Sequence, residues 1–502
     1  MALPYQIVVG LEVHVQLLTK SKLFCGCSTK FGAPPNSQVC PVCLGMPGVL
    51  PVMNRHAFEL ALRAALALNC QIASFTKWDR KNYYYPDLPK NYQISQYDLP
   101  FSSEGWLEIN AAADPKKEYK PKRIGIIRAH LEEDAGKNLH DESGRGGDSR
   151  IDLNRTGTPL LEIVSKPEIN SPEEAKAYLE ELRLMLREIG VSDCEMQEGS
   201  LRCDANVNIH IPEASGGGNA PGYAATPLVE VKNLNSFGSV GRAIAYEAER
   251  QYGEFKKDPK NYRFNKIPKT TAGWDVDKGV TVVQRHKEEA ADYRYFPEPD
   301  LVPVVVSERE LAAAQGAMGE LPAQQRKRLQ EPPYSLSAYD AGVLTAKGRK
   351  MVTYYEQVTN AVGDAKQVSN RLSDLVMGAL NERKEEIDQF PITAPKFAAF
   401  MKATATANQQ DRRDVFKHML EHGSDAAAAM TALGVKSASD FDEGALRKAV
   451  LDAIAANPQA VDDFRKGKTA AANRIKGHVM KANKGAPNDV VQKLLDEELA
   501  KA

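Results

Sequence analysis

Alternating apolar and polar positions run through the first part of the chain and predict half-buried β-strands. From Ile7 to Leu17 every second residue is aliphatic, and the positions between them include Glu12, His14 and Gln16. Residues 201–211 and 228–232 alternate in the same way. Because successive side chains of a strand point to opposite faces, each strand buries an aliphatic face and carries ionisable groups on the other. The pattern predicts an antiparallel sheet with one polar face.

A helix with clear end signals is predicted to begin after Ser171. Ser171 suits the N-cap, Pro172 the first helical position, and Glu174 lies three residues beyond the cap. Apolar residues follow at helical spacing as far as Ile189, and Gly190 ends the helix.

Helix-forming residues dominate the second part of the chain. The change falls near residues 295–300, where Pro297 and Pro299 interrupt regular structure, and a polar stretch at 404–411 separates later helical patterns. We therefore expect an α+β fold with a large sheet domain at 1–295, a helical domain at 296–410 and a small helical tail domain at 411–502. The glycine-rich segments 140–148 and 214–222 are expected to be loops.

Composition is that of an ordinary globular protein. The 502 residues suggest two to four domains, and 42% hydrophobic with 26% charged residues excludes a wholly disordered chain. A net charge of -1 argues against a uniformly basic nucleic-acid-binding surface, although a local basic patch can still form. We find no apolar run of membrane-spanning length and no secretory signal, so we expect a cytoplasmic protein without membrane partners.

Four of the seven cysteines lie in one short segment. A Cys-x-Cys pair and a Cys-x-x-Cys pair, joined by a turn-forming loop, are typical of a closed tetrahedral zinc site with a structural role. The alternative is a set of incidental thiols in a loop. The predicted Zn²⁺ ligands, which would brace the strand carrying Glu12 and His14, are Cys25, Cys27, Cys40 and Cys43.

Carboxylates occur inside apolar strands and indicate a second site. Glu162 lies in the apolar segment 159–164, where a carboxylate is costly to bury without a cation or hydrogen bonds. The run 128–134 ends in acidic residues, and Glu12 lies beside His14 on one strand face. Hard cations such as Mg²⁺ prefer carboxylate oxygens, so this face could hold Mg²⁺ and nucleotide phosphates. The alternative for each single residue is a solvated polar face.

Two basic segments could contact nucleic acid or phosphate. Residues 78–98 interleave basic and aromatic side chains, which pair with phosphates and stack on bases, or else form a tyrosine-rich turn packed on its own domain. Residues 465–484 contain seven Lys/Arg and no acidic residue, and Arg474, His478 and Lys481 share a helical face. The alternative for this tail is a solvated helix face. No phosphate-binding P-loop and no nucleophile for amide hydrolysis is recognisable.

Several long motifs resemble the GatB/GatE family, whose members are B subunits of tRNA-dependent amidotransferases. The resemblance covers the chain from end to end and is weaker in the middle helical region and the tail. The motifs are residues 10–17, 79–96, 132–137, 153–160, 199–206 and 292–300.

The resemblance implies an ATP-dependent transamidation of Glu-tRNA(Gln), Asp-tRNA(Asn) or both. The first domain would be a cradle similar to glutamine synthetase, and the tail would be similar to YqeY and bind tRNA. The amidase subunit GatA would supply ammonia, GatC would strap the two subunits together, and the cognate aminoacyl-tRNA synthetase is a further expected partner. The rival interpretations are a zinc-braced, non-catalytic tRNA-binding protein and a self-contained glutamine-dependent ligase.

The resemblance also implies site residues. Strict alternation from His130 would favour Glu132 as the metal ligand, whereas a strand end or bulge would favour Glu133, which the family pattern selects. The implied catalytic and Mg²⁺-binding residues are Glu12, His14, Glu133 and Glu162. Nucleotide or phosphate contacts are expected at Lys81, Asn82, Tyr83, Arg202, Asp204 and Glu230, and tRNA contacts at Arg474, His478 and Lys481.

Overall fold

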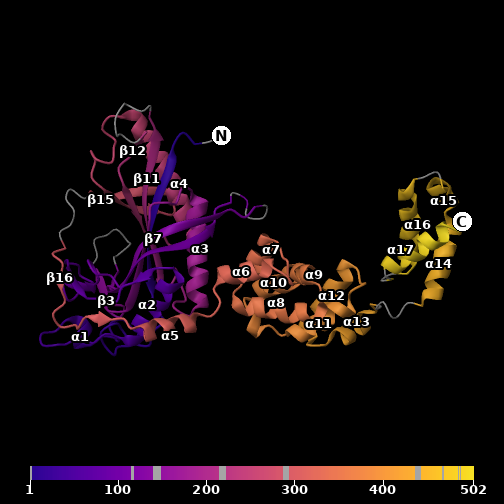
Figure 1. Cartoon of the computed structure of the whole chain (residues 1–502), viewed down its shortest axis with the longest axis horizontal. Coiled ribbons are helices and arrows are strands. Elements are labelled where there is room, and N and C mark those ends of the chain that lie inside the picture. Colours follow the sequence, from indigo (N-terminus) through magenta and orange to yellow (C-terminus); the bar gives the residue numbers. More distant parts are fainter. Residues whose placement is uncertain are drawn as a thin grey trace. The chain divides into compact units, whose positions relative to one another are not determined.

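The computed structural model divides into two compact units, Met1–Gln324 and Gln325–Ala502 (Figure 1). The residues it describes are 3–112, 114, 118–139, 149–213, 222–286, 293–435, 442–465, 468–483, 486 and 488–501. The expected loop at 140–148 and residues 214–221 of the expected loop at 214–222 lie outside these residues. None of the described helices is both long enough and apolar enough to cross a membrane.

A ten-stranded sheet forms the centre of the first unit. Its order is β15-β14-β13-β11-β1-β10-β7-β6-β2, with β12 paired to β11, and every pairing is antiparallel except β13 with β14. This confirms the α+β prediction. The strands are β1 (Gln6–Gln16), β2 (Gln71–Ile72), β6 (Ser102–Asn110), β7 (Pro121–Glu133), β10 (Pro159–Ser165), β11 (Leu201–Pro212), β12 (Tyr223–Ala225), β13 (Val229–Lys232), β14 (Thr270–Asp275) and β15 (Val280–His286).

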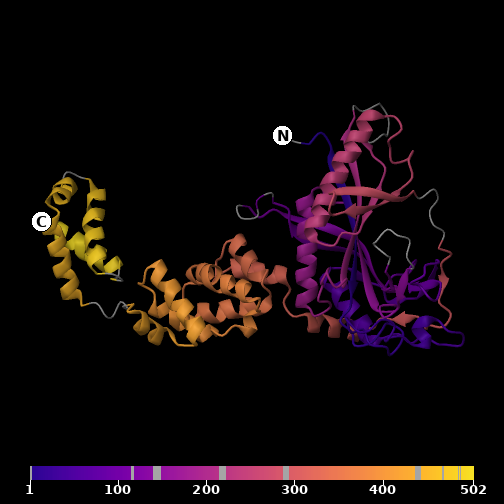
Figure 2. The ribbon, with the colours of Figure 1, turned by 180° about the vertical axis from the view of Figure 1, so that it is seen from behind.

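Helices α3 (Pro172–Glu188) and α4 (Phe237–Lys257) lie side by side against the sheet (Figures 1 and 2). Every second residue of β1 from Ile7 to Val15 is buried, while the residues between them remain partly accessible. The Ser171 side chain accepts a hydrogen bond from the Glu174 amide at the start of α3, as its cap signals predicted. The aliphatic face of the sheet thus forms the core, and the polar side chains occupy the other face.

Short elements surround one end of the sheet. Helix α2 (Arg55–Ala67) packs against α5 (Glu308–Met318), which brings residues beyond 300 into the first core. The remaining elements are α1 (Pro41–Leu44), the sheet β16 (Phe296–Pro297)–β4 (Asp79–Asn82)–β5 (Tyr92–Ser95), and the pairs β17 (Val304–Val305)–β3 (Phe75–Thr76) and β8 (Lys137–Leu139)–β9 (Arg150–Asp152).

The second unit is helical in its described residues and contains two apolar clusters. One cluster runs from Leu329 to Met430 and the other from Leu446 to Leu499. The first involves α6 (Pro322–Gln330), α7 (Ala338–Thr345), α8 (Arg349–Val362), α9 (Ala365–Arg371), η1 (Leu372–Val376), α10 (Met377–Arg383), η2 (Ile387–Gln389), α11 (Ala394–Ala403), α12 (Gln409–His422) and α13 (Ala426–Leu433). The second involves α14 (Glu443–Ala456), α15 (Pro458–Arg465), η4 (Thr469–Ala471), α16 (Ala472–Ala482) and α17 (Asn488–Leu499).

The limits of these cores differ from the expected boundaries at 295 and 410. Ala314 of α5 belongs to the core of the first unit. Val415 of α12 and Met430 of α13 belong to the cluster Leu329–Met430 of the second unit. The division into three domains itself stays a prediction.

Candidate metal and phosphate site

Histidine and carboxylate side chains gather on the polar face where β1, β10 and β7 are adjacent. The register pairs His14 with Glu162, and Glu162 with His130. His14 Nε2 lies 3.4 Å from Glu162 Oε2 and 3.9 Å from Glu132 Oε1, and His130 Nε2 lies 3.7 Å from Glu162 Oε2. His14, Glu132 and Glu162 each offer a ligand atom, and these atoms lie within 4.8 Å of one another. We call these three residues the acidic cluster.

Burial and mutual attraction shift the pKa values in this region. Burial opposes the charge of His14, but the hydrogen bond to Glu162 and the surrounding carboxylates outweigh it and raise its pKa to about 9. Burial raises the pKa of Glu132 to about 7, with Glu162 adding repulsion, and burial also raises the pKa of Glu12. Burial lowers the pKa of His130 to about 4. A divalent cation would relieve the repulsion among these carboxylates, so the donor set fits one.

The structure brings Glu132, and not Glu133, to this face. Pairing between β7 and β10 is continuous from Arg128 to Glu133, so the expected bulge at the acidic run does not occur and alternation keeps His130 and Glu132 together. Glu133 points away from the cluster, forms an ion pair with Lys90 and accepts a hydrogen bond from the backbone amide of Ile94.

A second acidic group adjoins the acidic cluster. Glu12, His14 and Asp204 offer ligand atoms within 4.8 Å of one another, and Glu12 is paired in register with Asp204. Lys232 forms ion pairs with Asp204 and with Glu230, whose carboxylate also accepts from the Thr271 hydroxyl. The predicted residues Glu12, Asp204 and Glu230 therefore lie on one polar face with His14.

Lys81 approaches the acidic cluster from β4. Its Nζ lies 5.1 Å from the ring centroid of Tyr293 and 5.8 Å from that of Tyr83, distances typical of cation–π contacts. Although burial opposes its charge, the carboxylates of Glu132 and Glu162 raise its pKa. The residue is thus a fixed cation facing the carboxylates, where a phosphate could also bind.

Three other predicted contacts are held by internal partners. The Asn82 side-chain amide donates to the carbonyl oxygen of Arg294 (2.8 Å). The Tyr83 ring packs near Tyr293, with centroids 5.9 Å apart, which agrees with the packed-turn interpretation of its segment. Arg202, opposite His14 in the register, donates to Asp134 (2.8 Å).

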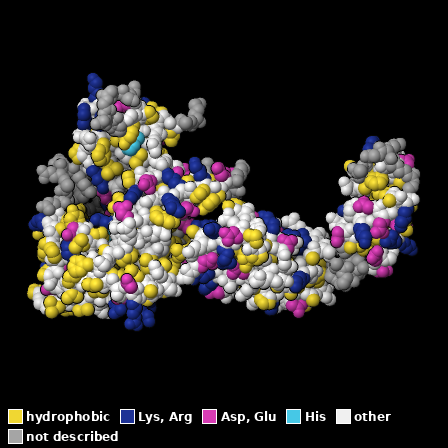
Figure 3. All heavy atoms as spheres, in the orientation of Figure 1, with side chains coloured by type: hydrophobic (Ala, Val, Ile, Leu, Met, Phe, Trp, Pro, Cys, Tyr) yellow, Lys and Arg dark blue, Asp and Glu magenta, His cyan; other side chains and the backbone are white. Residues whose placement is uncertain are grey.

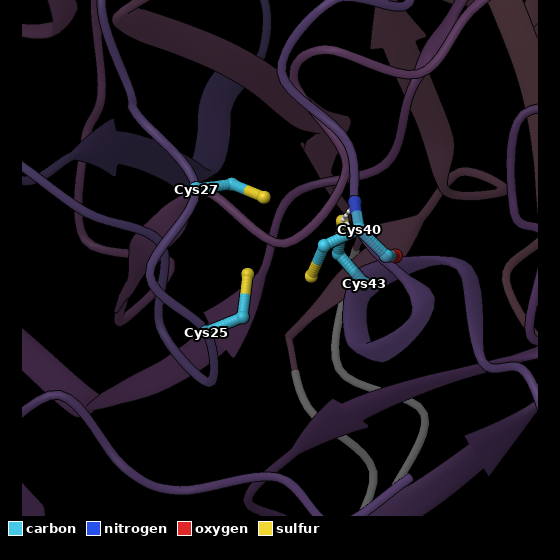
Figure 4. Close-up of side chains that lie close together, drawn as sticks. All are labelled: Cys25, Cys27, Cys40 and Cys43. Carbon is cyan, nitrogen blue, oxygen red and sulfur yellow. Dashed lines mark hydrogen bonds between the residues drawn. The ribbon is translucent and has the colours of Figure 1, made fainter.

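The four clustered cysteines face one another, with Cys25 and Cys27 on a loop and Cys40 and Cys43 at the short helix α1 (Figure 4). Their sulfur atoms lie within 4.8 Å of one another, and a tetrahedral zinc–thiolate site requires separations of about 3.8 Å. The cluster, Cys25, Cys27, Cys40 and Cys43, could therefore bind a metal ion such as zinc.

Hydrogen bonds favour the ionised form of one of these thiols. The pKa of Cys43 is lowered to about 4, first because Cys25 donates to its sulfur and further because the Cys40 amide donates to it and Lys22 lies nearby. A cavity between this cluster and the sheet is lined by Cys43, Lys22, Lys90 and Glu133, among others. The cysteines thus adjoin the Lys90–Glu133 pair as well as the segment that follows β1.

The predicted tail residues share the exposed face of α16. Arg474, His478 and Lys481 are exposed, whereas Ile475 and Val479 on the opposite face are buried. In the view of Figure 3, basic and acidic side chains are interspersed over the C-terminal helices. Residues 466–467 and 484 of the basic segment lie outside the described residues.

His130 and Lys90 are site residues that sequence analysis did not single out. His130 had a signal, since it lies two residues before Glu132 in an alternating strand. Lys90 had none, because it comes from the connection between β4 and β5, which has no periodicity.

A buried set of carboxylates on a sheet face, with a lysine beside it, is typical of enzymes that bind a divalent cation and phosphate groups. The sequence matches the family model of the GatB/GatE catalytic domain over residues 7–312 and that of the GatB domain over residues 353–499. The chain belongs to the GatB/GatE family.

Similar proteins cover almost the whole chain. The chain is 49% identical over 500 residues to the B subunit of the aspartyl/glutamyl-tRNA(Asn/Gln) amidotransferase of Rhodopirellula baltica, covering 99% of this chain and 97% of the relative. It is 46% identical over 498 residues to the protein of the same name from Moorella thermoacetica, covering 99% and 100%.

Proposed function

We propose that the chain is the B subunit of a tRNA-dependent amidotransferase. It phosphorylates the side-chain carboxylate of Glu-tRNA(Gln), Asp-tRNA(Asn) or both with ATP, and ammonia then displaces the phosphate to give the amide. The observation that carries this proposal is the acidic cluster with Lys81 beside it, in a chain that matches the family over both domains.

The chemistry explains why this subunit needs such a face. A free carboxylate is a poor acyl donor because its leaving group would be oxide, and phosphorylation supplies a better one. A Mg²⁺ ion held on this face would supply positive charge beside the transferred phosphoryl group. Glu132, Glu162 and His14, with Glu12 and Asp204 adjacent, would hold the cation, and Lys81 would orient phosphate oxygens.

The remaining parts of the proposal concern partners and zinc. No nucleophile for amide hydrolysis is recognisable in the sequence, so ammonia would come from the amidase GatA, with GatC as the third subunit. The four cysteines would bind one structural Zn²⁺, and the exposed face of α16 would contact tRNA. A reducing, cytoplasmic compartment belongs to the same proposal, since all seven cysteines are free thiols.

ATP hydrolysis tests the catalytic role. The purified chain is assembled with the amidase and strap subunits, and ATP cleavage is measured with misacylated tRNA, correctly acylated tRNA and no tRNA. We expect cleavage only with misacylated tRNA and Mg²⁺, and amidated tRNA only when glutamine or ammonia is added. Tight tRNA binding without ATP cleavage would instead support a non-catalytic tRNA-binding protein.

A further inference from the structure

Lys22 is a fully buried lysine beside the four cysteines. Its side chain is 0% exposed, and its Nζ donates to the carbonyl oxygen of Gln38 (2.7 Å) and lies 3.6 Å from Cys43 Sγ. Within the described part of the chain, no carboxylate lies within 4.0 Å of this ammonium. A buried ammonium with so few polar contacts needs an anionic partner.

Two acidic residues line the same cavity as Lys22, and both already have a cation. Asp300 is paired with Arg80, and the carboxylate of Glu133 is paired with Lys90. The sulfur of Cys43 is therefore the anionic group that remains for Lys22.

The charge of a zinc site in this position matches that requirement. Four thiolates and one Zn²⁺ carry a net charge of about −2, which is costly to bury without compensation. The backbone amide of Cys40 donates to Cys43 Sγ (3.2 Å), but an amide offers only a partial charge. Among the described residues, Lys22 supplies the one full positive charge in hydrogen-bonding contact with a cluster sulfur.

The backbone around Lys22 is held on several sides. Its amide donates to the carbonyl oxygen of Cys27 (3.0 Å), and its carbonyl oxygen accepts from the side chain of Asn54 (3.2 Å). The next amide, of Leu23, donates to Gly157 (2.8 Å). These hydrogen bonds fix the backbone from which the Lys22 side chain reaches Cys43, as is usual for outer-sphere partners of metal ligands.

We propose that Lys22 is the outer-sphere cation of the four-cysteine site: it donates to the Cys43 thiolate, offsets part of the negative charge of the zinc complex and so sets how tightly zinc is held. This inference rests on the proposed zinc binding. Lys22 is a positioning and charge-compensating residue here, and it does not coordinate the metal itself.

Zinc affinity of the full-length chain tests the inference. Competition with a chromogenic chelator gives the dissociation constant for Zn²⁺ in the wild type, Lys22→Met, Lys22→Gln, Lys22→Arg and the exposed control Lys20→Met. Lys22→Met and Lys22→Gln should weaken zinc binding by about ten- to a hundredfold, since outer-sphere partners contribute on that order. Lys22→Arg should retain most of the affinity, and Lys20→Met all of it.

The set of variants isolates the contact of the cation with the thiolate. Lys22→Gln keeps a polar side chain but loses the charge and the donor to Cys43, whereas Lys22→Arg keeps both, so a loss in Lys22→Gln that Lys22→Arg does not share reports this contact. Co²⁺ replacing Zn²⁺ gives a second readout, because removing a donor to one thiolate should shift the thiolate-to-cobalt absorption band in Lys22→Gln and not in Lys20→Met.

The outcomes distinguish the two proposals. A wild-type chain that binds neither Zn²⁺ nor Co²⁺ would overturn the zinc site. A wild-type chain that binds zinc only as tightly as Lys22→Met and Lys22→Gln would overturn the role of Lys22 alone. If Lys22→Met is insoluble, equal affinities of Lys22→Gln and Lys22→Arg would have the same meaning.

Discussion

Glu162 lies between two imidazole rings whose pKa values are shifted in opposite directions. Carboxylates around His14 raise its pKa to about 9 despite its burial, whereas burial lowers the pKa of His130 to about 4. At neutral pH His14 is therefore protonated and His130 neutral, and the buried Nδ1 of His130 has no hydrogen-bond partner among the described residues. A histidine ligates a metal only in its neutral form, so a cation that His14 coordinates must displace a proton from it.

Metal affinity should consequently rise with pH. Titration calorimetry from about pH 6 to about pH 9 should show Mg²⁺ binding that strengthens by up to about tenfold per pH unit below the His14 pKa. Deprotonation of Glu132, whose pKa is raised to about 7, adds to the dependence at the lower end. The His14→Asn variant should lose most of this dependence, while the exposed control His56→Asn keeps it. Binding in the wild type that is independent of pH would contradict a role for His14 as ligand.

Amide substitutions should distinguish the two neighbouring glutamates. Glu162→Gln and Glu132→Gln each remove a negative charge from the acidic cluster and should lower tRNA-dependent ATP cleavage by at least about a hundredfold. The KM for Mg²⁺ should rise in Glu132→Gln. In Glu133→Gln it should stay near that of the wild type, because Glu133 pairs with Lys90 on the other face. Measuring ATP cleavage against Mg²⁺ concentration decides between the geometry and the family pattern, since a raised KM only in Glu133→Gln would favour the latter.

At the level of elements, local patterns predicted some features and long-range pairing decided others. Strict alternation identified β1 and β11, and cap signals identified α3, because these features depend on neighbouring residues. The parallel pairing of β13 with β14 and the place of β7 beside β10 depend on register between distant segments, which periodicity does not encode. The register between β7 and β10 decides which face of the sheet carries Glu132. Periodicity alone therefore left the choice of metal ligand open between Glu132, which alternation favours, and Glu133, which the family pattern selects.

The four-cysteine element gives a prediction of its own. The wild-type chain should carry about one zinc per molecule, and Cys40→Ser should carry almost none and melt several degrees lower, because metal binding contributes folding energy. Cys70→Ser is the matched control, since Cys70 is a buried cysteine outside the cluster. It should lose stability but keep its zinc. Metal analysis after purification without chelators checks both variants, and full zinc content in Cys40→Ser would contradict the prediction.

At the level of the whole molecule, the chain has separate apolar cores, and this decides where it can be cut. A deletion from residue 411, the expected boundary, would remove α12 and α13 from the cluster Leu329–Met430. A chain ending at Val435 keeps the core of the first unit and the cluster Leu329–Met430 intact, and it removes the cluster Leu446–Leu499. Such a truncation should leave ATP binding and assembly with the amidase unchanged.

The truncated chain should bind charged tRNA more weakly and with less dependence on salt. For each phosphate group that the chain no longer binds, the slope of log affinity against log salt should fall by about one. Within the full-length chain, Arg474→Ala with Lys481→Ala should reproduce part of the effect, whereas Lys396→Ala with Lys402→Ala, exposed on α11, should not. Filter binding at two salt concentrations measures both. Identical affinities and slopes for all chains would place tRNA recognition within residues 1–435.

Gly45 ends the short helix of the cysteine cluster with a positive φ of 69°, and a β-carbon at this position would overlap the side chain of Lys90. The turn therefore lies directly against the residue that neutralises Glu133. A disulfide that included Cys43 would draw its sulfur atom to about 2 Å from its partner and would pull on the turn that lies against Lys90. The redox state of the cysteines would in this way reach a buried carboxylate near the acidic cluster.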